Sequence, residues 1–112
     1  MRMGLAGSSS VMPMPGYTAA KGAVVNLTRE RGLEYAGDGI QVNALCPGFH
    51  LTRIQNGAFD NPKFASMVMN STPAARIAEA SEIQGPTLFR ASSASDFMTG
   101  QVVVVGGGCV AK

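Results

Sequence analysis

The sequence has little of the chemistry on which metal-binding, nucleic-acid-binding and membrane proteins depend. A single histidine, His50, and two cysteines among 112 residues leave a metal site with few ligands to draw on. The formal net charge of +2 is spread along the chain without basic runs, which argues against a nucleic-acid partner. No apolar run approaches the length needed to span a membrane.

The features of a secreted protein are also missing. The start of the chain has neither a charged n-region nor a long apolar h-region, so we expect no secretory leader. Cys46 and Cys109 are far apart in the sequence, and we expect two small buried hydrophobic residues in preference to a disulfide. These absences together predict a soluble, cytoplasmic, reduced protein.

What the sequence does contain suits one compact domain over residues 1–112. Hydrophobic residues make up 46% of the chain and charged residues only 14%, a composition typical of a globular fold with a modest core. We find no internal repeat and no linker long enough to divide the chain.

The first regular element that the pattern predicts is a helix from Tyr17 to about Tyr35. Ala20, Val24 and Leu27 recur at three- and four-residue spacing, which gives this helix one apolar face. A glycine in its second half costs about 1 kcal/mol relative to alanine, so packing must hold that half in place.

Further along, the pattern changes to strands separated by helices. Residues 40–46 alternate apolar and polar positions as a strand does, and the four valines at 102–105 suit a parallel strand buried on both faces. The polar, proline-marked segment 49–73 is expected to be mobile, with one short helix near 63–69. A helix over about 81–90 contains a glycine and a proline, which imply a kink or a late start. The order of these elements predicts an α/β fold with a parallel sheet.

A tyrosine and a lysine stand one helical turn apart at the start of the first helix. The spacing of Tyr17 and Lys21 places both side chains on the same face. Taken alone, such a pair is more often exposed helix surface than a catalytic pair. The spacing by itself therefore leaves both interpretations open.

Four segments of the chain, in this order and spacing, resemble the C-terminal half of a classical short-chain dehydrogenase/reductase. They are YTAAK at 17–21, IQVNALCPGFHLT at 40–52, RIAEASEI at 76–83 and FMTGQVVVVGGG at 97–108. The resemblance extends from about Pro15 to Cys109. It implies a partial Rossmann-like parallel sheet, the C-terminal half of a doubly wound fold.

The resemblance also implies an oxidoreductase that uses NAD(H) or NADP(H) to move a hydride between a small-molecule alcohol and its carbonyl. By position, Tyr17 would be the catalytic acid/base, and Lys21 would favour its ionised form and hydrogen-bond the nicotinamide ribose. Pro47, Gly48 and Thr52 match the loop that borders the nicotinamide in the family.

The family's catalytic serine usually stands roughly a dozen residues before the tyrosine, and no serine occupies that place here. Ser9 or Ser8 could take the role through a shorter loop, although ordinary turn serines are the favoured interpretation.

Two other positions depart from the family pattern. Gly106 stands where an aspartate is common, and Arg90 stands where an apolar residue is common.

The chain lacks the glycine-rich phosphate turn with which the family binds the cofactor's pyrophosphate. Gly4 and Gly7 have the wrong spacing, and the glycines at 106–108 leave too few residues for the helix that should follow. We therefore expect the adenosine half of the cofactor site to be absent, which leaves NAD and NADP equally open.

One hypothesis is an enzyme completed by a partner chain or by self-association. The other is a non-catalytic oligomeric remnant or truncated fragment with a binding or assembly role, and both predict a homo-oligomer.

Overall fold

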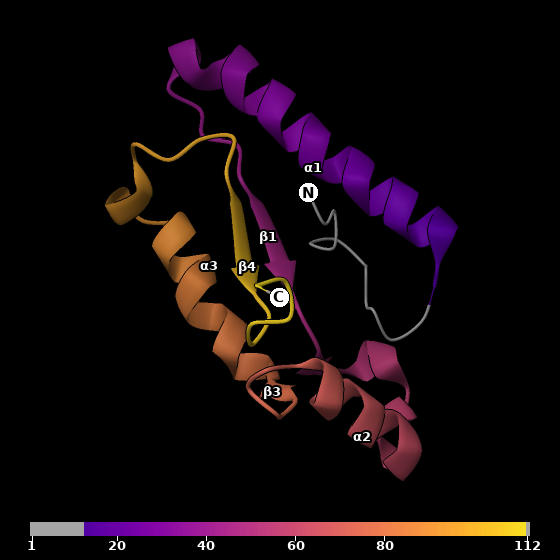
Figure 1. Cartoon of the computed structure of the whole chain (residues 1–112). Coiled ribbons are helices and arrows are strands. Elements are labelled where there is room, and N and C mark those ends of the chain that lie inside the picture. Colours follow the sequence, from indigo (N-terminus) through magenta and orange to yellow (C-terminus); the bar gives the residue numbers. More distant parts are fainter. Residues whose placement is uncertain (1–12, 112) are drawn as a thin grey trace.

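The computed structural model describes residues 13–111 and has an α/β arrangement (Figure 1). Its helices and strands follow in the order α1 (Pro15–Tyr35), β1 (Ala44–Pro47), β2 (His50–Leu51), α2 (Pro62–Ser71), β3 (Ala78–Glu79), α3 (Gln84–Arg90) and β4 (Val102–Val105). Short 3-10 turns, η2 to η6, connect several of these elements.

The centre of the fold is the pair of parallel strands β1 and β4. Ala44 lies opposite Val102, and Pro47 lies opposite Val105. Figure 1 shows α1 on one side of this pair and α3 on the other. Parallel strands separated by crossover helices confirm the predicted partial Rossmann-like sheet.

Helix α1 confirms the predicted first helix, and it begins at Pro15, two residues before the expected start. Its buried residues are Val25, Thr28 and Gly32. A Cβ added to Gly32 would lie 2.6 Å from the backbone nitrogen of Gly100, so only glycine permits this approach. Packing against the start of β4 therefore holds the second half of the helix, as the sequence required.

The apolar stripe predicted for α1 is not the face that the structure buries. Ala20 is exposed, and Val24 and Leu27 keep 51% and 55% of their surface accessible. The prediction that these residues form the packed, apolar face of the helix was therefore wrong for the described residues. The buried residues of α1 are Val25, Thr28 and Gly32 instead, because the helix backbone comes close to the strands.

Strand β1 is shorter than the predicted strand over residues 40–46, and that prediction was wrong for 40–43. There, the Val42 N–H donates to the Thr99 hydroxyl at 3.2 Å, and the Val42 carbonyl accepts from the Gly100 N–H at 2.7 Å. The Asn43 side chain donates to the Met98 carbonyl at 2.6 Å. Bonds to the segment 98–100 thus hold residues 42 and 43 where a regular strand ladder was expected, which apolar alternation does not reveal.

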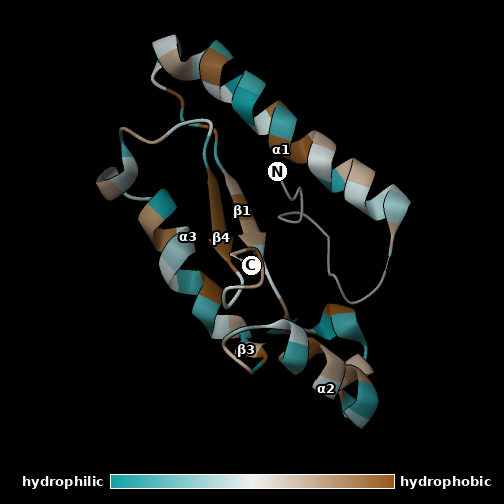
Figure 2. Ribbon diagram, in the orientation of Figure 1, coloured by the Kyte–Doolittle hydropathy of each residue, from teal (hydrophilic) through white to brown (hydrophobic). Residues whose placement is uncertain are grey.

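Strand β4 confirms the position and parallel pairing predicted from the valine run, but not its predicted burial on both faces. Each of the four valines is only half-buried, because β4 has a single described neighbour in the sheet. Figure 2 shows this strand as one of the most hydrophobic parts of the ribbon. The buried hydrophobic residues of the described chain are Val25, Ala44, Cys46 and Val68. Cys109 is half-buried, and both cysteines are free thiols.

The segment 49–73 contains more regular structure than the sequence indicated. The predicted short helix is confirmed as α2 and is longer than expected. The Asn61 side chain caps it by accepting from the backbone N–H groups of Lys63 and Phe64. The rings of Phe49, Phe59 and Phe64 cluster, with centroids 5.6 to 6.5 Å apart. The expected mobility of this segment stays a prediction.

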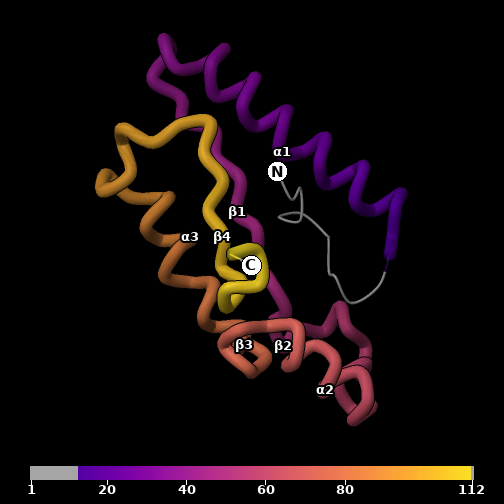
Figure 3. Tube along the Cα trace, in the orientation of Figure 1, coloured from indigo at the N-terminus to yellow at the C-terminus, as the bar shows by residue number. Residues whose placement is uncertain are grey.

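A second pair of short parallel strands lies at the end of the molecule that carries α2 (Figure 3). His50 in β2 pairs with Ala78 in β3, a contact that the sequence did not predict because each strand has only two residues. The 3-10 turn η5 (Ala80–Ile83) follows β3, and α3 then begins at Gln84. The helix therefore starts later than the pattern indicated, which is the second of the two predicted alternatives.

Candidate active site

The predicted pair lies on the first two turns of α1. The Lys21 Nζ lies 5.5 Å from the centroid of the Tyr17 ring, within cation–π distance. Tyr17 keeps 48% of its surface accessible. One helical turn therefore brings the phenol and the ammonium together on an open surface, where a ligand could reach both.

The positive charge of Lys21 also acts on β1. Burial raises the pKa of the Cys46 thiol, while the charges of Lys21 and Arg90 favour its thiolate and oppose that rise. Cys46 is the third residue of β1, so Lys21 lies within electrostatic range of the sheet. The charge of Lys21 thus acts on the buried thiol of β1.

The turn after β1 carries the next predicted site residues. A Cβ on Gly48 would lie 2.7 Å from the Cα of Gly106, and the Gly48 N–H donates to the Val105 carbonyl at 2.8 Å. Pro47 and Gly48 therefore hold the carboxyl ends of both strands close together. In open α/β sheets this end of the strands is where ligands bind.

Thr52 lies four residues beyond Gly48, immediately before the 3-10 turn η3 (Arg53–Gln55). Its hydroxyl donates to the Gln55 side-chain oxygen. The residue is exposed. Its hydroxyl hydrogen is thus committed to a local bond, while its oxygen can still accept one.

His50 has a structural position that the sequence did not reveal. It is 5% exposed, and its Nδ1 lies 3.1 Å from the Gly48 carbonyl oxygen. A carbonyl only accepts, so Nδ1 carries the hydrogen and donates it. Its Nε2 has no hydrogen-bond partner among the described residues. His50 therefore fixes the turn after β1.

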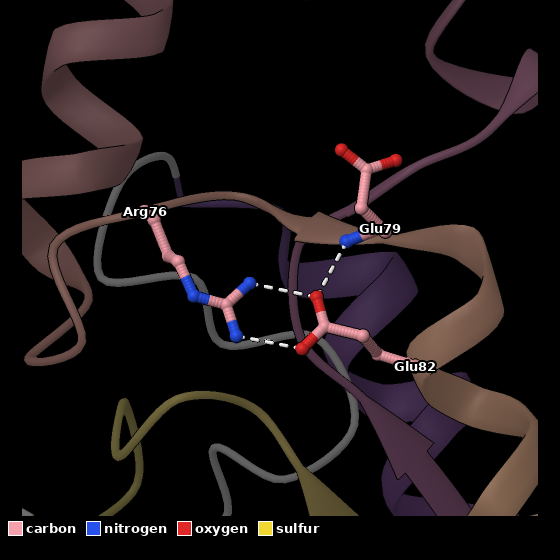
Figure 4. A network of polar contacts seen from close by, with 3 residues as sticks. All are labelled: Arg76, Glu79 and Glu82. Carbon is pink, nitrogen blue, oxygen red and sulfur yellow. Dashed lines mark hydrogen bonds and ion pairs between the residues drawn. The ribbon is translucent and has the colours of Figure 1, made fainter.

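An ion pair that the sequence analysis missed links the segment just before β3 to the 3-10 turn η5 just after it (Figure 4). The guanidinium of Arg76 makes two bonds to the carboxylate of Glu82, at 2.7 and 2.6 Å, and the Glu79 N–H donates to the same carboxylate at 2.7 Å. These bonds lower the pKa of Glu82 to about 2. The sequence signal that could have revealed this contact is the Glu-x-x-Glu spacing of a capping box at 79–82.

Ser9 and Ser8, the candidate serines, lie outside the described residues. Within residues 13–111, no group of three or more His, Cys, Asp and Glu side chains could hold a metal ion. None of the described helices is long and apolar enough to cross a membrane. The structure thus brings Tyr17 and Lys21 together at one end of α1, and Pro47 and Gly48 together at the end of β1.

The arrangement defines a class of protein. A parallel sheet with a helix on each side is typical of proteins with a Rossmann-like fold. A family model described as Enoyl-(Acyl carrier protein) reductase matches residues 2–110. The chain belongs to the short-chain dehydrogenase/reductase family, as its four sequence segments indicated.

Curated relatives match most of this chain but only part of their own length. The chain is 38% identical over 99 residues to 2-dehydro-3-deoxy-D-gluconate 5-dehydrogenase of Bacillus subtilis (strain 168), covering 88% of this chain and 39% of the relative. It is 41% identical over 92 residues to galactitol 2-dehydrogenase (L-tagatose-forming) of Cereibacter sphaeroides, which covers 82% of this chain and 36% of the relative. The chain therefore spans less than half the length of these relatives.

Solved structures give the same picture of the fold. Gluconate 5-dehydrogenase from Burkholderia cenocepacia J2315, in complex with NADP and tartrate, superposes with a TM-score of 0.84 at 37% identity, over 88% of this chain and 39% of that one. A 4-hydroxyisoleucine dehydrogenase complexed with NADH superposes with a TM-score of 0.85 at 27% identity, over 96% of this chain and 45% of that one. The described elements thus keep the arrangement that they have in longer family members.

Proposed function

We propose that this chain carries the acid/base half of an NAD(P)-dependent dehydrogenase site that acts on alcohols and carbonyls. The observation that carries the proposal is the Tyr17–Lys21 contact, in a chain that belongs to the family. The bound nicotinamide would supply or accept the hydride. This chain's own residues would supply the proton.

Tyr17 is the proposed acid/base. Its hydroxyl would give a proton to the substrate oxygen during reduction and take one during oxidation. The ammonium of Lys21 lies 5.5 Å from the ring centroid, next to the side chain proposed to transfer the proton. Ser9 is the proposed third catalytic residue, with an ordinary turn serine as the alternative.

The residues around the end of β1 fit the nicotinamide half of the cofactor. Gly48 keeps the turn free of a side chain, and the adjacent Pro47 has no N–H to leave unpaired. Together with Tyr17, Lys21 and Thr52 they are the proposed cofactor-binding residues. The adenosine half finds no glycine-rich turn in this sequence, and we propose that a partner chain or an unusual self-association completes that half of the site by other groups.

The proposed substrate is a small polyhydroxylated acid or alcohol. Relatives named for 2-dehydro-3-deoxy-D-gluconate, gluconate and galactitol support this class, because all three compounds carry several hydroxyls. Neighbouring structures contain NADP in one case and NADH in another, which supports either cofactor.

We further propose that residues 1–112 form one soluble, cytoplasmic domain that assembles as a homo-oligomer. Val24, Leu27 and Leu33 of α1 expose 51%, 55% and 75% of their surface, and the valines of β4 are half-buried. Exposed large apolar side chains of this kind favour association. The proposed contact buries the outer face of α1, strand β4, or both.

The alternative is a non-catalytic remnant or truncated fragment whose surfaces serve binding or assembly. The short span of the chain relative to its relatives favours this alternative. Titration with NADH and NADPH separates the two functions. Saturable thermal stabilisation supports the dehydrogenase site, and no response at millimolar cofactor supports the remnant.

A further inference from the structure

The segment 49–73 begins and ends beside the same short stretch of chain, the end of β4 and the glycines that follow it. Just before the segment, the Gly48 N–H donates to the Val105 carbonyl at 2.8 Å. Just after the segment, the Ala74 N–H donates to the Gly107 carbonyl at 3.0 Å. Figure 3 shows the yellow C-terminal turn beside the chain that leads out of α2. Two backbone hydrogen bonds therefore tie both ends of the segment to one place.

The three glycines at 106–108, here called the glycine run, let the end of the segment come this close. A Cβ on Gly107 would lie 2.8 Å from the Thr72 Cγ2. A Cβ on Gly108 would lie 3.1 Å from the Pro73 Cβ. Both distances are shorter than an ordinary contact between carbon atoms, which is about 3.5–4.0 Å. The packing at the end of the segment therefore leaves no room for side chains on these glycines.

The two ends of the segment are also linked to each other through its own packing. The ring of Phe49, at the start, lies 6.4 and 6.5 Å from the rings of Phe59 and Phe64, and Phe64 belongs to α2. Further along α2, Val68 is fully buried, and its carbonyl accepts from the Thr72 hydroxyl at 2.9 Å. A continuous series of contacts thus joins the start of the segment to the residue that touches the glycine run. Packed side chains of this kind carry a displacement from one site to another.

We propose that Gly107 is a positioning residue that couples the two ends of the segment 49–73, so that the turn after β1 and the chain after α2 shift together. The coupling itself is a property of one chain and needs no ligand. Its consequence for the site rests on the function proposed above, because Pro47, Gly48 and Thr52 are the proposed cofactor-binding residues at the near end.

The test replaces Gly107 by alanine and measures amide exchange at both ends of the segment. The Ala74 amide reports the far end, and the Ala78 amide, which donates to the Phe49 carbonyl at 3.0 Å, reports the near end. Gly107→Ala should reduce the protection factors of both amides by about tenfold, because the added methyl has no room beside Thr72.

Gly39→Ala is the matched control for backbone strain. Gly39 and Gly107 have φ values of 73° and 58°, so alanine strains the backbone at either position. Among the described residues, nothing lies within 4 Å of a Cβ on Gly39. Gly39→Ala should therefore leave the Ala74 and Ala78 amides close to their protection in the parent chain.

The double variant Gly107→Ala/Thr72→Ser tests whether the contact is the cause. Serine removes the Cγ2 methyl of Thr72 and keeps the hydroxyl that bonds to the Val68 carbonyl. Protection of both amides should recover in part, because the Ala74 Cβ still lies 3.1 Å from the Cβ position of Gly107. Where Gly107→Ala does not fold, Pro73→Ala is the milder change at the same contact, and the same two amides decide.

Exchange in the presence of millimolar NADH or NADPH separates the coupling from the proposed function. In the parent chain, a bound cofactor should raise the protection of the Ala78 amide and of the distant Ala74 amide together. A parent chain that responds to neither cofactor contradicts the proposed function, while the comparison without cofactor still decides the coupling. The coupling is overturned if Gly107→Ala loses protection at Ala74 alone, if it behaves as Gly39→Ala does, or if a cofactor protects Ala78 without Ala74.

Discussion

At the scale of single residues, the proposed chemistry of the site depends on Tyr17 and Lys21. Their contact needs no tertiary structure beyond the helix, because one turn places them side by side. This explains why the sequence could predict the pair. It also explains why the pair by itself could not show a function, since many surface helices contain the same spacing.

Replacing Tyr17 by phenylalanine should abolish turnover of a polyol or sugar acid with NAD(P) while leaving the fold intact. The change removes only the hydroxyl of a side chain that is 48% exposed. Tyr35→Phe is the control on the same helix, because Tyr35 accepts a bond from Arg31 far from Lys21 in the sequence. Turnover and circular dichroism measure the two effects, and unchanged turnover in Tyr17→Phe ends the catalytic assignment.

The Arg76–Glu82 ion pair predicts how stability depends on pH. Its bonds to the Arg76 guanidinium and the Glu79 N–H lower the pKa of Glu82 from 4.5 to about 2. Because the folded pKa is depressed, the contribution is complete above the ordinary value of 4.5 and is lost as pH falls toward about 2. Melting temperature should therefore fall across this window, and less steeply in Glu82→Gln.

The control for this measurement is Glu30→Gln, which removes an exposed carboxylate with no described hydrogen bond or ion pair. Its melting temperature should follow that of the parent chain across the same window. Equal slopes in the parent and in Glu82→Gln would show that the ion pair does not contribute to the acid sensitivity of the fold.

At the scale of secondary-structure elements, helices and strands with a clear sequence period could be predicted, and very short strands could not. Helix α1 and strand β4 follow from local pattern, since apolar spacing and a valine run depend on neighbours in sequence. Residues 40–43 are held by Thr99, Gly100 and Met98, which lie more than 50 residues away in the chain. Strands β2 and β3 have two residues each and leave no period to detect.

The burial of these elements was harder to predict than their type. The face of α1 that packs on the sheet is built around Gly32, which a hydrophobic pattern counts as an interruption. The stripe predicted as the apolar face of α1 is left exposed by the structure. Local pattern shows which residues could be buried, whereas the number of neighbouring elements decides which are.

Gly32→Ala tests the close approach between α1 and the start of β4. Alanine gains about 1 kcal/mol of helix propensity, but its Cβ would lie 2.6 Å from the Gly100 nitrogen, where overpacking costs about 1–3 kcal/mol. We expect a net loss of stability in urea unfolding. Gly16→Ala is the matched control, since nothing lies within 4 Å of its Cβ, and it should not destabilise. A stabilised Gly32→Ala would contradict the packing.

At the scale of the whole molecule, the described chain has few buried residues for its length. Large apolar side chains remain accessible on α1 and α3, among them Leu33 at 75% and Leu88 at 69%. A sheet of two paired strands is marginal by itself in water. These features favour a state in which another chain covers part of the surface.

Self-association should therefore be visible at micromolar concentration. Static light scattering is expected to report a symmetric dimer or a larger oligomer. Val103→Lys should break the assembly or precipitate the protein, because a charge buried without a partner costs several kcal/mol. A well-behaved monomer with a cooperative melt would contradict this prediction.

The central claim is that Tyr17, Lys21 and the turn after β1 form the nicotinamide side of a dehydrogenase site. The most direct measurement is the melting temperature of the chain during titration with NADPH and, separately, NADH. The claim predicts saturable stabilisation by at least one cofactor, which Lys21→Ala weakens and the remote Lys63→Ala does not. No stabilisation by either cofactor at millimolar concentration would contradict it.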